Sequence, residues 1–111
     1  MKQETIDKVL KFREERNWKQ FHNPKDLVLS LNLEASELLE VFQWSGADLE
    51  CWDKIDKIKE ELADVLNYCI LIADAYKLDM DQIVLDKMKG NERKYPVEKA
   101  KNSSRKYTEF V

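Results

Sequence analysis

The amino-acid sequence predicts an all-α protein, and three observations support that fold class. Only two glycines and two prolines interrupt the 111 residues. Between them lie long runs of Leu, Glu, Lys and Ala, which are good helix formers. The alternation of apolar and polar residues that is typical of a β-strand never continues for more than a few positions. We therefore expect a small number of long helices.

Two helices are expected in the first half of the chain. The first covers about residues 3–18, where apolar residues form a partial stripe at helical spacing. Asn23 followed by Pro24 predicts the N-cap and first-turn proline of a second helix. That helix should continue to about Trp44, because Ser45 and Gly46 then provide a stop and a turn.

Two further helices are expected after a short helical link near residues 48–52. The third covers about residues 53–76 and is the most apolar element of the chain. The fourth covers about residues 81–92 and ends before Tyr95, since a residue preceding proline disfavours helix. We expect residues 1–100 to form a single domain and residues 101–111 a polar tail.

Composition narrows the classes of partner. The net charge of −3 is the small difference between 22 acidic and 19 basic residues and favours no charged partner. No apolar run approaches the roughly 20 residues that cross a bilayer.

The cysteines and the start of the sequence bear on location. Cys51 and Cys69 form no CxxC pair, and no secretory signal opens the sequence. We expect reduced thiols, a cytoplasmic location, and neither a nucleic-acid nor a membrane partner.

Two pairs of acidic residues occupy unusual places on the long helices. Glu34 and Glu37 form an ExxE pair, and Glu61 and Asp64 form an ExxD pair. At about 100° per residue, Glu34 and Glu61 fall inside the apolar stripes, whereas Glu37 and Asp64 fall at their edges. The stripe residues are Leu27, Leu31, Leu38 and Val41 in one helix, and Val65, Tyr68 and Ile72 in the other.

Carboxylates that face a core need cations, because unpaired buried charges destabilise a fold. A divalent metal bound by all four acids is one explanation. A buried ion-pair network with lysines is the other, and the pattern alone favours neither. A single ExxE is usually a solvated helix face, and we assign Glu40, Glu50 and Glu60 to that class.

If the four acids bind a metal, the donor set indicates which metal. Hard oxygen ligands without histidine or thiolate suit Mg²⁺, or else Mn²⁺. A di-iron bundle would need Glu-x-x-His pairs, and the one histidine, His22, forms none. All-carboxylate Mg²⁺ sites usually complete their coordination with phosphate oxygens, so a polyphosphate substrate is expected.

The spacing of ExxE, 23 residues and ExxD resembles the signature of the MazG-like all-α nucleotide pyrophosphohydrolases. The resemblance covers about residues 3–100 and looks closest to the dCTP pyrophosphatase branch. Three further segments carry it: residues 17–24 (NWKQFHNP), residues 42–44 (FQW), and Lys87-Met88 with residues 91–96. The resemblance implies a four-helix bundle-like MazG-type fold, with ExxE and ExxD on its two long central helices.

The resemblance also implies an activity, the conversion of a (deoxy)nucleoside triphosphate to the monophosphate and pyrophosphate. Glu34, Glu37, Glu61 and Asp64 would bind the metal. Glu37, at the edge of its stripe where water can reach, is our candidate for activating the attacking water. The expected substrate is dCTP or a modified pyrimidine nucleotide, although Asn67 and Tyr68 leave the subfamily open.

Substrate-binding residues are expected in two groups. The segment from Lys87 to Lys106 is rich in basic residues, most of which we expect to be solvated. By resemblance, Lys87, Asn91 and Lys94 are the phosphate contacts, and their spacing places them on one helical strip. Aromatic rings can stack on a nucleobase. The resemblance places Trp18, Trp44 and Tyr68 around the nucleoside, with His22 as a further hydrogen-bonding candidate.

Two other functions remain open at this stage. A related phosphoribosyl-ATP pyrophosphohydrolase shares the acidic pattern, but the WKQFH and FQW segments argue against it. A non-catalytic helical interaction module would instead bury its apolar stripes in an interface and pair its acids with lysines. We also expect a homodimer or homotetramer, because these few helices cannot easily cover both apolar faces and four buried acids.

Overall fold

The computed structural model describes residues 1–110, and every regular element in that range is helical. The predicted all-α fold class is therefore confirmed. The chain divides into two compact units, Met1–Lys77 and a second unit that begins at Leu78. The prediction of one domain over residues 1–100 stays a prediction. Within residues 1–110, no helix is both long and apolar enough to span a membrane.

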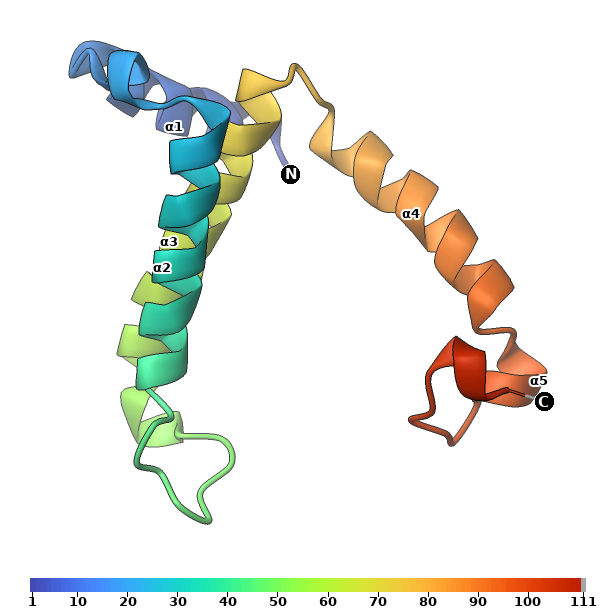
Figure 1. Ribbon diagram of the computed structural model, residues 1–111. Coiled ribbons are helices and arrows are strands. Elements are labelled where there is room, and N and C mark those ends of the chain that lie inside the picture. Colours follow the sequence, from blue (N-terminus) through green and yellow to red (C-terminus); the bar gives the residue numbers. More distant parts are fainter. Residues whose placement is uncertain (111) are drawn as a thin grey trace. The chain divides into compact units, whose positions relative to one another are not determined.

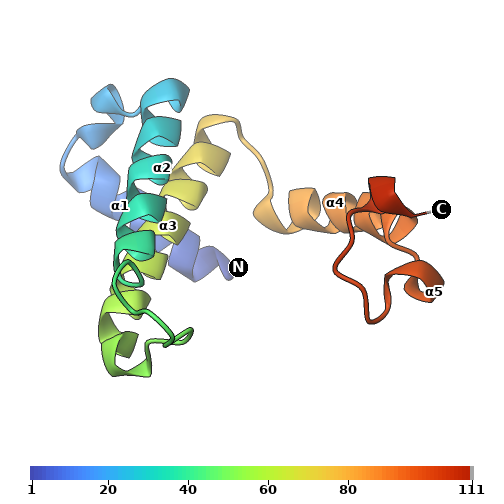
Figure 2. The same ribbon diagram turned by 60° about the horizontal axis from the view of Figure 1, so that its bottom comes forward.

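Three α-helices build the first unit: α1 (Gln3–Glu15), α2 (Pro24–Glu40) and α3 (Ile55–Ala75). Two short 3₁₀ helices join them, η1 (Trp18–Phe21) and η2 (Trp52–Lys54). Helices α2 and α3 run side by side in opposite directions over most of their length (Figure 1). Helix α1 packs against α3, as the rotated view also shows (Figure 2).

The start of α2 is as predicted, but its end is not. The side chain of Asn23 accepts a hydrogen bond of 2.9 Å from the Asp26 N–H, and Pro24 occupies the first turn. The helix ends at Glu40, so the predicted end at Trp44 is wrong. The N–H groups of Val41 and Phe42 bond to carbonyls three residues back, which tightens the chain into turns.

Local hydrogen bonds shape the connection between α2 and α3. The Asp48 carboxylate accepts hydrogen bonds from the N–H groups of Glu50 and Cys51, at 3.1 and 3.0 Å. Lys54 Nζ donates to the Val41 carbonyl at 3.2 Å and so fixes the two ends of the connection together. These bonds position the start of α3 against the end of α2.

The core of the first unit is small. Its most buried apolar side chains include Leu27 on α2 and Ile70, Leu71 and Ala73 on α3. Cys51 is also buried and packs at the other end of the helix pair. Many large apolar side chains remain exposed, including Leu29 and Leu33 on α2 and Leu62 and Leu66 on α3. The unit therefore presents apolar surface beyond its own core.

A buried arginine attaches α1 to α3. Arg13 is 5% exposed, and its Nη1 lies 2.9 Å from Asp74 Oδ2 near the end of α3. Its Nη2 lies 2.6 Å from the Glu14 carboxylate. A buried charge needs such partners, because the guanidinium has lost its hydration. The pairing fixes the position of α1, which forms one wall of the cavity described below.

The second unit contains α4 (Met80–Lys94), α5 (Val97–Ala100) and η3 (Tyr107–Glu109). The Asp79 side chain caps α4 by accepting a 3.0 Å hydrogen bond from the Gln82 N–H. Within this unit the rings of Tyr107 and Phe110 pack edge-to-face on Tyr95, with centroids 5.9 and 5.7 Å away. The polar tail thus includes aromatic residues that contact the chain just after α4.

The Arg13–Asp74 pair gives a stability prediction. Asp74→Asn should lower the free energy of unfolding by about 2 kcal/mol, because a charge-assisted hydrogen bond to a buried guanidinium is weakened. Urea unfolding followed by circular dichroism measures the change. Asp53→Asn, at an exposed position in η2, is the matched control and should stay within about 0.5 kcal/mol of the wild type. Equal stability of the two variants would contradict a role for the pair.

Candidate metal centre

The four predicted acids converge in the first unit. Glu34 and Glu37 lie on α2, and Glu61 and Asp64 lie on α3. Because α2 packs along α3, the two pairs face each other across the helix interface. One carboxylate oxygen from each residue can be chosen so that all four lie within 4.8 Å of one another. The arrangement brings together two pairs of acids that are far apart in the sequence.

Burial differs among the four acids as the helical wheel predicts. Glu61 is only 5% exposed, Glu34 is half-buried, and Glu37 is exposed. Glu34 Oε2 and Glu61 Oε2 are both buried, and neither accepts a hydrogen bond from any of residues 1–110. A buried carboxylate oxygen without a donor is costly, so these two atoms indicate a ligand.

Mutual repulsion perturbs the titration of the cluster. Hydrogen bonding with Glu34 and then with Glu61, together with the nearby negative charge of Glu34, raises the pKa of Glu37 to about 7. The pKa of Glu61 is lowered, chiefly by its hydrogen bond from Lys57 and against the effect of burial. Strongly perturbed carboxylates are frequent at functional sites.

The residues fit a divalent metal. The available donors are carboxylate oxygens, and the two oxygens without partners come from different helices. A divalent cation would neutralise charge that the ion pairs among residues 1–110 leave unbalanced, since Lys57 contacts the cluster through Glu61 alone. Oxygen-only donors favour a hard cation. The cluster is therefore a candidate metal centre.

A cavity of about 390 Å³ adjoins the cluster. Glu34 and Asp64 form part of its wall, together with Asn67 and Tyr68 from α3. The remaining wall comes mainly from α1 and the connector that follows it: Lys8, Val9, Phe12, Arg13, Trp18, His22 and Leu71. The volume lies within the usual range for small-molecule pockets, and its wall combines aromatic rings with carboxylates.

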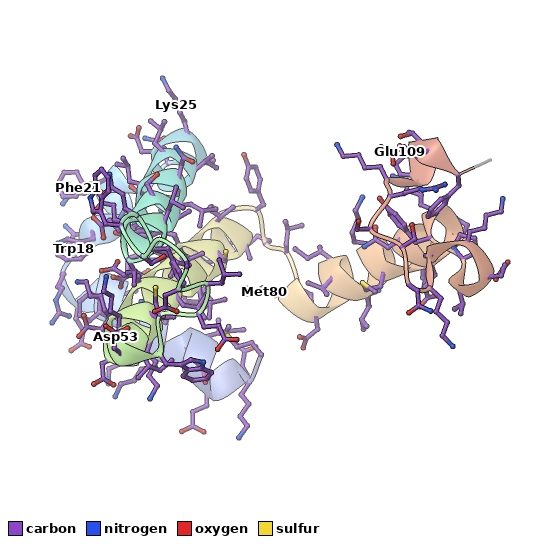
Figure 3. The ribbon with its side chains drawn as sticks, turned by 90° about the horizontal axis from the view of Figure 1, so that it is seen from below. Trp18, Phe21, Lys25, Asp53, Met80 and Glu109 are labelled. Carbon is purple, nitrogen blue, oxygen red and sulfur yellow. The ribbon has the colours of Figure 1, made fainter. Side chains whose placement is uncertain are left out.

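The aromatic wall has an ordered geometry. The ring of Trp18 meets that of Phe12 edge-to-face, with centroids 5.6 Å apart. His22 lies edge-on to Trp18 at 6.5 Å. Trp18 and Phe21 lie on the same side of the first unit (Figure 3). Burial, with a further contribution from the positive charge of Arg13, lowers the pKa of His22. Its imidazole is therefore neutral at pH 7.

The predicted substrate-binding residues are found in three places. Trp18, His22 and Tyr68 line the cavity beside the metal centre. Trp44 is 87% exposed in the turns after α2 and does not line this cavity. Lys87, Asn91 and Lys94 belong to α4, in the second unit. Within that unit, Lys94 Nζ lies 4.8 Å from the centre of the Tyr107 ring.

Several residues at the site were not predicted from the sequence, and two of them are cations that form ion pairs. Arg13 lines the cavity as a buried cation, and the signal was a basic residue within the apolar stripe of α1. Lys57 Nζ lies 2.8 Å from Glu61 Oε1. The sequence feature that could have indicated this contact is the spacing of four residues between Lys57 and Glu61, which places both on one helical face.

The sequence and the structure both match known proteins. Residues 29–110 match the model of the MazG-like family. The crystal structure of a pyrophosphatase from Archaeoglobus fulgidus aligns with a TM-score of 0.78 and 39% sequence identity. That alignment covers 84% of this chain and 90% of the other. The chain belongs to the MazG-like family.

Curated relatives carry more specific names. Human dCTP pyrophosphatase 1 is 42% identical over 104 residues, covering 89% of this chain and 61% of the human protein. The Bos taurus dCTP pyrophosphatase 1 is 39% identical, with 89% of this chain and 62% of the relative aligned. The chain thus spans about three-fifths of the length of these relatives.

The single histidine gives a prediction for the cavity. Because burial disfavours the imidazolium, His22 should titrate below its ordinary pKa of 6.5 in the folded protein. Proton NMR of the histidine ring measures this without assignment, since the chain contains no other histidine. The urea-unfolded chain provides the reference. A folded pKa at or above that of the unfolded chain would show that His22 is solvated.

Proposed function

We propose that this protein hydrolyses a nucleoside triphosphate to the monophosphate and pyrophosphate. In this reaction the oxygen of water bonds to the α-phosphorus, and the bond from that phosphorus to the α,β-bridging oxygen breaks. That oxygen leaves as part of pyrophosphate, and the proton of the attacking water is lost. The observation that carries the proposal is the position of the acidic cluster, which contributes Glu34 and Asp64 to the wall of an aromatic-lined cavity. Nucleotides combine a ring that stacks with a polyanion that needs cations.

The proposed cofactor is Mg²⁺, with Mn²⁺ as an alternative, held by Glu34, Glu37, Glu61 and Asp64. When bound, the metal neutralises phosphate charge and polarises the phosphoryl oxygens. The partnerless oxygens of Glu34 and Glu61 support these two residues as ligands. The proposal requires no other metal-binding group.

Glu37 is the proposed residue for positioning and deprotonating water. Among the glutamates of the cluster it is the exposed one, so water reaches it most readily. Hydrogen bonding with Glu34 and then with Glu61 raises the pKa of Glu37 to about 7. A carboxylate of raised basicity accepts a proton from water more readily than an ordinary glutamate.

The cavity supports the proposed nucleoside site. Trp18 and Tyr68 offer ring faces or edges for a base, and the neutral imidazole of His22 offers one donor and one acceptor. His22 Nδ1 is buried and has no hydrogen-bond partner among residues 1–110. The names of the relatives favour dCTP or a modified pyrimidine nucleotide. Trp44 remains proposed for the nucleoside by resemblance alone.

Lys87, Asn91 and Lys94 are the proposed phosphate contacts. They follow one another at helical spacings of four and three residues on α4, so they share one face of that helix. The Asn91 side chain makes a long contact of 3.7 Å with Met88 Sδ, a weak interaction that a phosphate oxygen could replace. Their role rests on resemblance and on the chemistry of these side chains.

The enzyme proposal predicts that loss of one cluster carboxylate abolishes turnover. Glu37→Gln and Asp64→Asn should each lower kcat/KM by at least about a hundredfold, since each removes a proposed metal ligand and Glu37 also the proposed base. Pyrophosphate release from a panel of nucleoside triphosphates with Mg²⁺ measures this. Glu15→Gln, an exposed residue at the end of α1, is the matched control and should retain full activity.

The same assay separates the proposed function from its rivals. Release of pyrophosphate from dCTP supports the proposal, whereas release from phosphoribosyl-ATP alone would indicate the related activity. If the wild type released none from any nucleotide, the interaction module would be the better explanation. Circular dichroism of each variant confirms that lost activity does not reflect lost structure.

We further propose that the protein is a homodimer or homotetramer. Leu29 and Leu33 lie one turn apart on α2 and are 54% and 64% exposed. Leu62 and Leu66 form a similar exposed pair on α3. Apolar residues gathered at helical spacing on a surface are typical of interfaces. A second copy of the chain is the proposed partner.

Disruption of this apolar surface should change the mass in solution. The double variant Leu29→Lys with Leu33→Lys should shift the protein to a monomer, because burying two ammonium groups in an interface is unfavourable. Sedimentation equilibrium measures the mass. Thr5→Lys, at an exposed position on α1, adds charge elsewhere and should leave the oligomer intact. A monomeric wild type would contradict the proposal.

A further inference from the structure

Lys57 makes a direct contact with the acidic cluster that the proposed function does not use. Its Nζ lies 2.8 Å from Glu61 Oε1, and 3.7 Å from Glu60 Oε2. The Glu61 side chain is 7% exposed, whereas that of Lys57 is 59% exposed. The ammonium group therefore reaches from solvent to the most buried carboxylate of the cluster.

Lys57 approaches the cluster from a different hollow than the aromatic cavity. This second hollow has a volume of about 460 Å³ and is lined by Glu37, Glu40, Val41, Lys54, Lys57 and Glu61. None of these residues lines the aromatic cavity. Lys54 is already occupied, since its Nζ bonds to the Val41 carbonyl. Of the two lysines in this hollow, Lys57 is therefore the one that forms an ion pair with a carboxylate of the cluster.

A metal ion bound at the cluster would compete with Lys57 for Glu61. The ammonium occupies Glu61 Oε1, while Glu61 Oε2 has no partner. One positive charge reduces the repulsion among four carboxylates but does not cancel it. A divalent cation neutralises more charge, and the flexible stem of Lys57 can swing back to solvent at low cost. The two cations would therefore exchange.

We propose that Lys57 is an internal counter-ion, which holds Glu61 in the metal-free protein and is displaced when a divalent cation binds. Lys57 then raises the metal concentration at which the site fills. It also stabilises the metal-free fold by pairing with a buried charge. This inference rests on the proposed function, because it requires a metal at the four acids.

A simpler role for Lys57 makes a different prediction. Lysine and glutamate four residues apart on a helix often form a pair that adds only slight helix stability. Such a pair would affect the melting temperature of the protein, but it would not by itself alter the affinity for metal. Metal affinity measured without nucleotide therefore distinguishes the two roles.

The test measures Mn²⁺ binding to the metal-free 111-residue chain, from the electron paramagnetic resonance signal of free Mn²⁺. Lys57→Gln should tighten Mn²⁺ binding by about twofold to fivefold, the value of one partly exposed ion pair. Lys57→Arg retains the cation and should bind like the wild type. Lys59→Gln removes an exposed lysine of the same helix and controls for net charge, which moderate salt screens.

Each outcome bears on the proposal. Tighter binding in Lys57→Gln, with Lys57→Arg and Lys59→Gln near the wild type, supports it. Unchanged or weaker binding in Lys57→Gln overturns it, and so does equal tightening in Lys59→Gln. If the wild type binds Mn²⁺ and hydrolyses nucleotide, and Lys57→Gln binds Mn²⁺ with the same affinity, the proposed role of Lys57 is wrong. The proposed function then still stands. If the wild type binds no Mn²⁺, the metal centre fails with it.

Discussion

Electrostatic repulsion among four carboxylates is the constraint on which the rest of the site depends. Glu34, Glu37, Glu61 and Asp64 offer oxygens within 4.8 Å of one another at a helix interface. Like charges at that separation disfavour the folded state unless protons or cations offset them. Hydrogen bonding with Glu34 and Glu61, with a contribution from the charge of Glu34, raises the pKa of Glu37, and Lys57 pairs with Glu61. The repulsion therefore lowers stability at this interface, as expected of a candidate cation site.

The surrounding structure holds the carboxylates in place despite their repulsion. The Asn23 cap starts α2 at a defined residue, and the bond from Lys54 to Val41 fixes the connection to α3. The Arg13–Asp74 pair attaches α1, so the aromatic wall stays beside the cluster. A long antiparallel helix pair suits this purpose, because each helix contributes two acids from adjacent turns.

The sequence predicted the helices and the cluster well, because both depend on periodicity. A helical wheel placed Glu34 and Glu61 towards the core, and in the structure both have a buried oxygen without a partner. Individual side-chain contacts leave weaker signals in the sequence than helical periodicity does. The burial of Arg13 depends on packing between α1 and α3. The turns that end α2 before Trp44 and the contact of Lys57 with Glu61 are local, but nothing in the helical periodicity distinguishes them. The packing of Phe110 on Tyr95 was likewise absent from any local pattern.

The melting temperature of Glu34→Gln, with and without Mg²⁺, tests the central claim most directly. Glu34 has a buried oxygen without a partner, and it forms no ion pair with any of residues 1–110 that the substitution would break. If the cluster is a metal centre, the metal-free variant should melt above the wild type because one repelling charge is gone. Mg²⁺ should then stabilise the wild type but not the variant. A variant that melts lower, and that gains as much from Mg²⁺ as the wild type, would contradict the account.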